Sequence, residues 1–202
     1  MKLEQLKELL YQALETETGG IEIYKAALSC AVNNDLKKEW QEYLEQTRNH
    51  ERIVREAMKK VGLDPEHETP GRAVVRHLGE SLVHAIEMAK DAGDEDAAQV
   101  VAAECVVLAE TKDHLNWELI GEAAKKMKGD EGKALKAAHD EVEDEEDEHL
   151  YHTKGWCREL WFKSLGLKAM LPPPEEKQDV KTAVEAANVE KERKKQSSKP
   201  RR

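Results

Sequence analysis

The sequence is poor in the features that define several large classes of protein. Only 4% of its 202 residues are aromatic and only 6 are proline. No stretch shows the alternation of β-branched and polar residues that a half-buried strand needs. No apolar run reaches the roughly 20 residues of a membrane span, and the N-terminus has no signal-peptide core. We therefore expect neither a strand-rich fold nor a membrane protein.

Cysteine is also scarce, and acidic residues outnumber basic ones. The three cysteines, Cys30, Cys105 and Cys157, form no Cys-x-x-Cys pair and are odd in number. This favours small buried hydrophobes in a reducing cytoplasm over a disulfide framework or a cysteine zinc site. The formal net charge of −10 argues against a main body that binds nucleic acid.

What the sequence has in quantity is typical of helices. It is 37% charged and 39% hydrophobic, and is rich in Ala, Leu, Glu and Lys, which predicts an all-α fold. Apolar residues recur at three-four spacing between clear stop signals, such as Gly62 with Pro65, and start signals, such as Thr69 with Pro70. The predicted helices cover roughly residues 2–32, 35–61, 70–93 and 94–128, with a fifth from 129–130 onward.

Short turns between these helices predict two antiparallel hairpins joined by a shorter connector helix. The hairpins resemble each other in motif, which suggests an internal pseudo-repeat. Residues 1–168 should form this bundle. In residues 169–202, Pro172-Pro173-Pro174 should end the ordered body. The low hydrophobicity beyond it predicts a flexible, disordered tail that is basic over residues 191–202.

Acid and imidazole groups lie where the helical stripes should be apolar. Burying one unpaired carboxylate costs several kcal/mol, and no lysine or arginine falls on the stripes at the same level. A cation among these side chains would remove the penalty. The residues of ligand type on the stripes are Glu17, His50, Glu110, Glu146 and His149.

Charge balance predicts how many cations such a site holds. Glu17, Glu110 and Glu146 supply three negative charges, and Asp113, one turn after Glu110, would make four. Two divalent ions balance four negative charges, and neutral histidines complete a shell of oxygen and nitrogen donors. Such donors suit iron or manganese better than they suit zinc. Asp113 has a simpler reading as an ordinary surface acid.

The spacing of these residues resembles the ferritin-like superfamily, which includes rubrerythrins, bacterioferritins and a YciE/YciF-like stress-response branch. Glu17 precedes Tyr24 by seven residues, Glu110 precedes Trp117 by seven, and Glu146 with His149 forms a Glu-x-x-His motif. Over residues 2–165 the resemblance implies an antiparallel four-helix bundle with an extra connector helix and a di-iron site.

The chain departs from that pattern at one position. Thr47, three residues before His50, stands where the rubrerythrin pattern has a bridging Glu, although Thr also occurs there in the YciE-like branch. Either Asp113 compensates, or one metal site is weak or empty. The cysteine pairs of the rubrerythrin electron-transfer module are missing, so rubrerythrin proper is not expected.

The resemblance implies a di-iron oxidoreductase that reacts with dioxygen or peroxide in stress protection or iron handling. Tyr24 and Trp117 would be redox neighbours of the metals. The electron donor is unknown, and a homodimer is open. One alternative is an iron-storage bundle without turnover. Another is a metal-free structural stress protein, in which the buried acids pair with the histidines.

Overall fold

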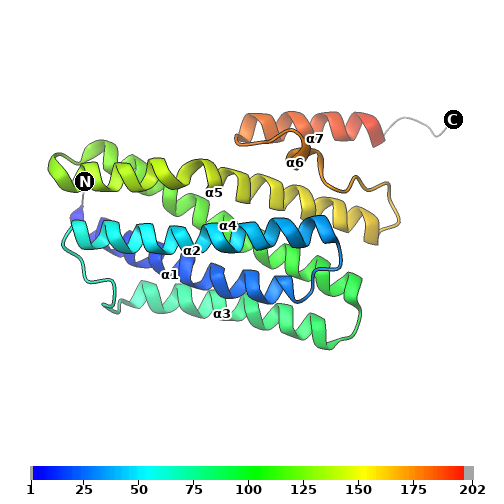
Figure 1. Ribbon diagram of the computed structural model, residues 1–202, viewed down its shortest axis with the longest axis horizontal. Helices are drawn as coiled ribbons and strands as arrows, with labels where there is room; N and C mark the ends of the chain where they lie inside the picture. The colour runs from blue at the N-terminus through cyan, green and yellow to red at the C-terminus, as the bar shows by residue number, and fades with distance from the viewer. Residues whose placement is uncertain (1, 198–202) are drawn as a thin grey trace.

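The computed structural model describes residues 2–197 and is all-helical, with no strand in that range (Figure 1). The prediction of an all-α fold is confirmed, and the five predicted helices correspond to α1–α5. Two further helices follow them. The helices are α1 (Leu3–Leu28), α2 (Asn34–Lys60), α3 (Pro70–Asp91), α4 (Glu95–Lys126), α5 (Gly129–Ser164), α6 (Pro174–Lys177) and α7 (Ala183–Ser197).

Local signals in the sequence set the ends of the helices. Asn33, Thr69 and Asp94 each accept a backbone N–H bond with the side-chain oxygen at the start of α2, α3 and α4. Such caps satisfy amides that the first helical turn leaves without partners. Gly62 and Gly93 follow α2 and α3 with positive φ angles of 77° and 83°, a conformation that glycine adopts without strain.

The four long helices α1, α2, α5 and α4 pack in a closed ring, because α1 contacts α2 and α4 while α5 contacts the same two helices. The helix α3 lies outside this ring against α1 and α4, at the bottom of the view in Figure 1. It carries the chain back along the length of the molecule, so α2 and α4 run in the same direction. A Cβ built on Gly19 of α1 would lie 3.8 Å from the Cα of Gly79 in α3, which shows how closely these two helices approach.

Two apolar clusters fill the ring and leave a polar layer between them. The first cluster includes Tyr24, Trp40 and Trp156, and the second includes Leu14 and Trp117. Along each of the four helices the chain passes from one cluster to the other. The residues at the crossing are the acids and histidines that interrupt the apolar stripes, so the packing places them all at one level.

The C-terminal segment corrects one prediction. Residues 174–177 and 183–197 are helical, so the prediction of a disordered tail is wrong for them. Charged side chains dock the segment on α5: the Arg193 guanidinium donates to Glu159 at 2.9 Å and lies 4.7 Å from the Phe162 ring centroid. Arg158 of α5 donates to Glu175 at 2.6 Å. The end of the basic stretch, residues 198–202, lies outside the described residues.

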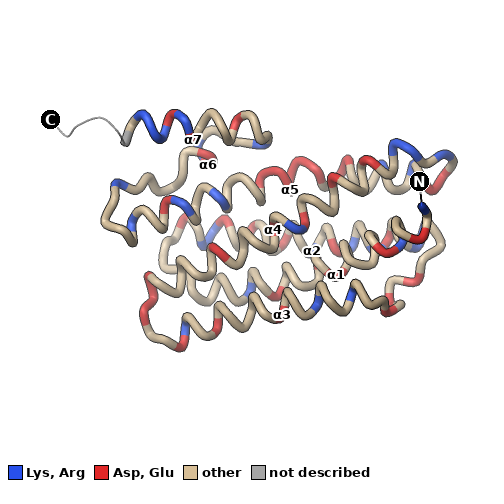
Figure 2. Tube along the Cα trace, turned by 180° about the vertical axis from the view of Figure 1, so that it is seen from behind, with Lys and Arg blue, Asp and Glu red and all other residues tan. Residues whose placement is uncertain are grey.

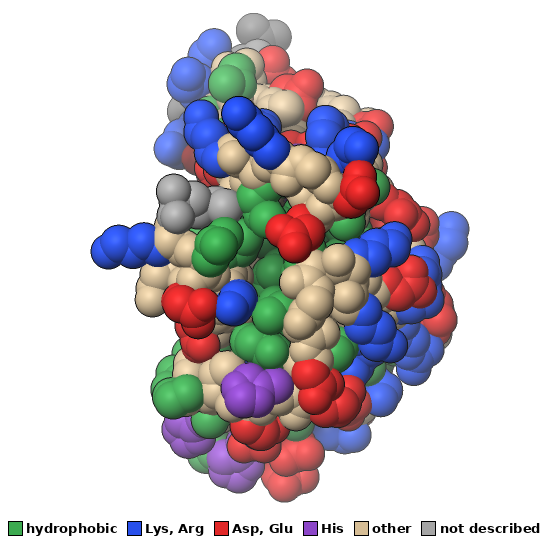
Figure 3. Space-filling model, turned by 90° about the vertical axis from the view of Figure 1, so that its left-hand side faces the viewer, with side chains coloured by type: hydrophobic (Ala, Val, Ile, Leu, Met, Phe, Trp, Pro, Cys, Tyr) green, Lys and Arg blue, Asp and Glu red, His purple; other side chains and the backbone are tan. Residues whose placement is uncertain are grey.

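Charges of both signs cover the surface. Figure 2 shows a run of acidic residues on α5 and basic residues on α7. In Figure 3 the end of the molecule near the start of α1 shows a strip of hydrophobic side chains flanked by acids and bases. Among helices of the described residues, none is both long enough and apolar enough to cross a bilayer.

Candidate metal centre

All six residues predicted to bind metal lie together in the polar layer. Each is at most 4% exposed, and four helices contribute: α1, α2, α4 with two residues and α5 with two. The prediction that they face the interior is confirmed, whereas metal binding itself stays a prediction. The six are Glu17, His50, Glu110, Asp113, Glu146 and His149.

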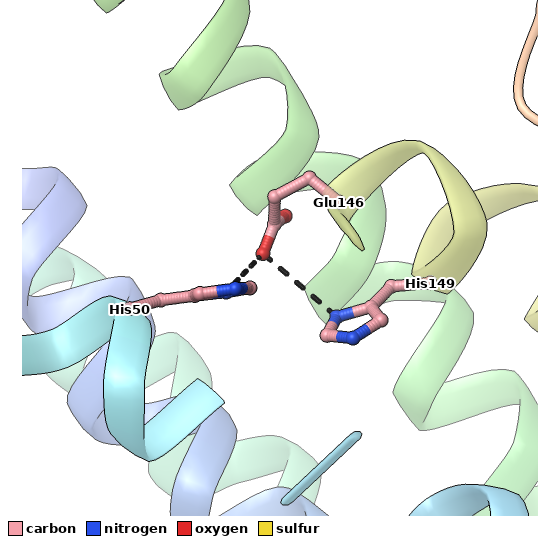
Figure 4. A group of neighbouring side chains, drawn as sticks. All are labelled: His50, Glu146 and His149. Atoms are coloured by element: carbon pink, nitrogen blue, oxygen red, sulfur yellow. Dashed lines mark hydrogen bonds and ion pairs between the residues drawn. The ribbon is translucent and has the colours of Figure 1, made fainter. Parts of the chain in front are cut away.

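The first group of ligand-type atoms joins α2 to α5 (Figure 4). Glu146 Oε1 lies 2.8 Å from His50 Nδ1 and 3.8 Å from His149 Nδ1. Glu110 Oε2 approaches the same His149 nitrogen at 3.5 Å. Two imidazole nitrogens therefore converge on one carboxylate, with a second carboxylate beside them.

The second group joins α1, α4 and α5. One oxygen each from Glu17, Asp113 and Glu146 lies within 4.8 Å of the others. Glu17 Oε2 also lies 4.0 Å from His50 Nδ1. Glu146 belongs to both groups, so one carboxylate connects two adjacent positions at which oxygen or nitrogen donors converge.

Both histidines are oriented from outside the layer. His149 Nε2 lies 2.8 Å from the Gln46 side-chain oxygen, which can only accept, so this nitrogen carries the proton and Nδ1 keeps a free lone pair. His50 Nε2 lies 2.7 Å from Glu145 Oε2, leaving Nδ1 toward Glu146. Outer hydrogen bonds of this kind are typical of histidines that bind metals. The sequence analysis missed Gln46 and Glu145, because neither lies on an apolar stripe.

The two aromatic candidates connect the halves of the pseudo-repeat. The Tyr24 hydroxyl of α1 donates to Glu110 Oε1 of α4 at 2.7 Å. The Trp117 indole N–H of α4 donates to Glu17 Oε1 of α1, also at 2.7 Å. Each aromatic thus holds one oxygen of the acid in the other half, and each acid has its second oxygen free for another partner.

Among the described residues, those second oxygens have no hydrogen-bond partner, although each lies 3.5–4.0 Å from a histidine nitrogen. Five buried atoms of the layer lack a hydrogen bond: Glu17 Oε2, Glu110 Oε2, Asp113 Oδ1, Glu146 Oε2 and His149 Nδ1. No ion pair of the described residues joins any of the four carboxylates to lysine or arginine. Buried polar atoms are nearly always satisfied in native proteins, so five unsatisfied lone pairs at one level form a place suited to a cation, a proton or a water molecule.

Burial and mutual repulsion favour protonated carboxyls when no cation is present. Burial, followed by the charges of Asp113 and Glu146, raises the pKa of Glu17 well above its usual range. Burial, followed by Glu146 and Glu110, does the same to the pKa of Asp113. For Glu146, burial and then Glu110 raise the pKa from 4.5 to about 8.

This predicts how the stability of the metal-free protein depends on pH. The folded carboxyls hold protons that the unfolded chain releases near pH 4.5, so stability falls as pH rises from there to about 8. In the presence of a chelator, the melting temperature should be lower at pH 8 than at pH 5.5. Glu146→Gln should flatten this slope, and Glu141→Gln, an exposed acid of the same helix, should leave it unchanged. A melting temperature that rises over this interval would contradict the expectation.

The structure places Asp113 in the layer that the departure at position 47 leaves short of one carboxylate. The structure buries Asp113 at 4% exposure and groups it with Glu17 and Glu146, so the surface reading of this acid is wrong. Thr47 is also buried, with its hydroxyl donating to the Tyr43 carbonyl at 2.8 Å. The layer therefore holds four carboxylates, with the fourth on α4 in place of α2.

The chain matches no protein-family model, no curated protein and no solved structure. The function of the chain is therefore inferred from its own residues and their geometry.

Proposed function

We propose that this chain is a ferritin-like protein with a two-cation carboxylate and histidine site, holding iron, that reacts with dioxygen or peroxide in stress protection or iron handling. The observation that carries the proposal is the set of five unpartnered lone pairs, all in one buried layer with four carboxylates.

The path of the chain supports the ferritin-like part of the proposal. Two antiparallel hairpins, α1 with α2 and α4 with α5, are joined by one connection that spans the molecule and contains α3. Ferritin-like folds have one such long crossover, and their metal site lies in the core with ligands from facing helices.

The donor set fits two divalent ions. One would be held by His50 and His149 with Glu110 beside them, and the other by Glu17 and Asp113. Glu146 would be shared, since it belongs to both groups. Oxygen and imidazole donors without thiolate suit iron or manganese. When bound, two ferrous ions supply two electrons, which is the number that reduces peroxide to water.

The remaining residues position these groups and exclude water. Gln46 and Glu145 fix the histidine rings, and the indole of Trp117 and the phenol of Tyr24 each fix one carboxylate. The two aromatics contact the ligands directly, so they are placed to exchange an electron with the site. An external electron donor completes the cycle.

Metal content tests the proposal. Protein reconstituted anaerobically with ferrous iron should hold close to two ions per chain and, after exposure to oxygen, should absorb in the near-ultraviolet as ferric carboxylate sites do. Repeated consumption of peroxide with an added reductant would separate an enzyme from a storage protein. A ratio of iron to chain near zero in well-folded protein would overturn the proposal and would favour a metal-free structural protein.

A further inference from the structure

A surface cleft opens directly onto the candidate metal centre. It has a volume of about 390 Å³, lies between α4 and α5, and includes Trp117 and Glu146 among its lining residues. Glu146 is 2% exposed and its Oε2 has no partner. The cleft therefore reaches a buried residue of the polar layer that has one carboxylate oxygen without a hydrogen-bond partner.

The walls of the cleft carry ligand-type groups between the surface and this oxygen. Five carboxylates line it against two ammonium groups, those of Lys125 and Lys181. His114 Nε2 lies 2.7 Å from Asp147 Oδ1, and His139 Nδ1 lies 3.4 Å from Glu143 Oε2. The first pair is half-buried and the second joins a buried histidine to an exposed acid, so both can replace some of the water around a cation before it reaches the interior.

The helices leave room for this lining. A Cβ on Gly121 of α4 would come within 2.3 Å of the His139 ring, so the glycine lets that ring lie flat against α4. The segment Lys181–Ala183, at the start of α7, forms part of the rim, and Lys181 pairs with Glu148 at 2.6 Å. Three other clefts of the described residues include none of the six candidate ligands.

We infer that this cleft is the entry route by which hydrated divalent cations reach the buried site, with Glu143 and Asp147 attracting the ion and Glu146 receiving it. The inference rests on the proposed function. An acidic, narrow opening concentrates cations at its mouth and raises their rate of association, and this effect weakens with salt.

The rate of cobalt(II) uptake tests the inference separately from the number of ions bound. Metal-free full-length protein is mixed with Co(II) at low ionic strength, and the cobalt absorption is followed in a stopped-flow instrument. The cleft variant is Glu143→Gln with Asp147→Asn. The control is Glu141→Gln with Asp144→Asn, which removes the same two charges from exposed positions of α5 outside the cleft.

The cleft variant should take up cobalt roughly fivefold more slowly than the control at low salt, with a smaller salt dependence and the same final ratio of two ions per chain. Equal rates in the two variants would overturn the route and leave the site intact. A lower final ratio of cobalt to protein in the cleft variant would mean that Glu143 or Asp147 is a metal ligand, and would also overturn the entry route. If the parent protein binds no cobalt, the proposed function fails, and the route with it.

Discussion

Protein loaded with iron should melt roughly 10 °C above the same protein freed of metal at pH 7.5, given about 4 kcal/mol of stabilisation at a thousandfold excess over Kd and about 2–4 °C per kcal/mol for a chain of this size. Without metal, the buried carboxylates repel one another, and burial raises the pKa values of Glu17, Asp113 and Glu146. The unfolded chain has no preformed site, so the free energy of binding adds to the stability of the folded state.

The shift should also increase with pH. Cations displace the protons of Glu17, Asp113 and Glu146, whose pKa values are raised by burial, and displacement becomes easier as the proton concentration falls. Calorimetry at pH 6 and pH 8, with and without iron, measures both effects. A folded variant with Glu17→Gln and Glu146→Gln should show little shift. Identical melting curves for the metal-free and iron-loaded parent would rule out tight binding to the folded state.

The sequence predicts the inward face of each long helix because the interruptions are in phase with the apolar stripes. Glu17 follows Leu14, and His50 precedes Ile53, in each case by three residues. Helical periodicity then requires the polar residue to face the same interior as its apolar neighbours. The apolar stripes alone therefore predict five of the six buried candidates, without any knowledge of contacts between helices.

Burial of Asp113 could not be decided in this way. On a helix with one buried face, an acid at its position can lie at the edge and reach water. Here α4 packs against both α1 and α5, and Asp113 lies with Glu17 and Glu146 of those two helices. The packing of α1 and α5 on this part of α4 is tertiary structure that no local pattern in the helix encodes.

The C-terminal segment was mispredicted for a related reason. Its low hydrophobicity predicts too little apolar burial to offset the entropy of ordering. The structure instead docks it through charge: Arg193 pairs with Glu159, 34 residues earlier in the chain and fully buried. Composition alone does not predict an ion pair whose partners lie so far apart in sequence.

Asp113→Asn should reduce the bound iron from about two ions per chain to about one. The substitution keeps the size of the side chain and removes one of four negative charges from a buried layer, where the attraction between ion and ligand is strong. Loss of an outer partner of a metal ligand costs about 10–100-fold in affinity, and loss of a ligand should exceed that. Asp144→Asn, an exposed acid, is the control and should keep two ions. An unchanged ratio in Asp113→Asn would mean that this carboxylate does not bind metal.

Thr47→Glu in the Asp113→Asn background should restore the second ion. Thr47 lies one turn before His50 on the buried face of α2, and its methyl carbon would be 3.2 Å from a Cβ at position 20, where the chain has glycine. The absence of a side chain at Gly20 lets position 47 pack closely against α1, the helix that carries Glu17. A glutamate at position 47 supplies the fourth negative charge from α2 in place of α4. Metal content measured by elemental analysis should therefore rise from one ion toward two.

Thr47→Glu alone adds a fifth carboxylate and should lower the melting temperature of the metal-free protein, because the carboxylates then repel one another more strongly with no additional cation. If the double variant folds, as judged by its helical circular dichroism, and still binds one ion, position 47 faces apolar core and the carboxylate on α4 cannot be exchanged for one on α2.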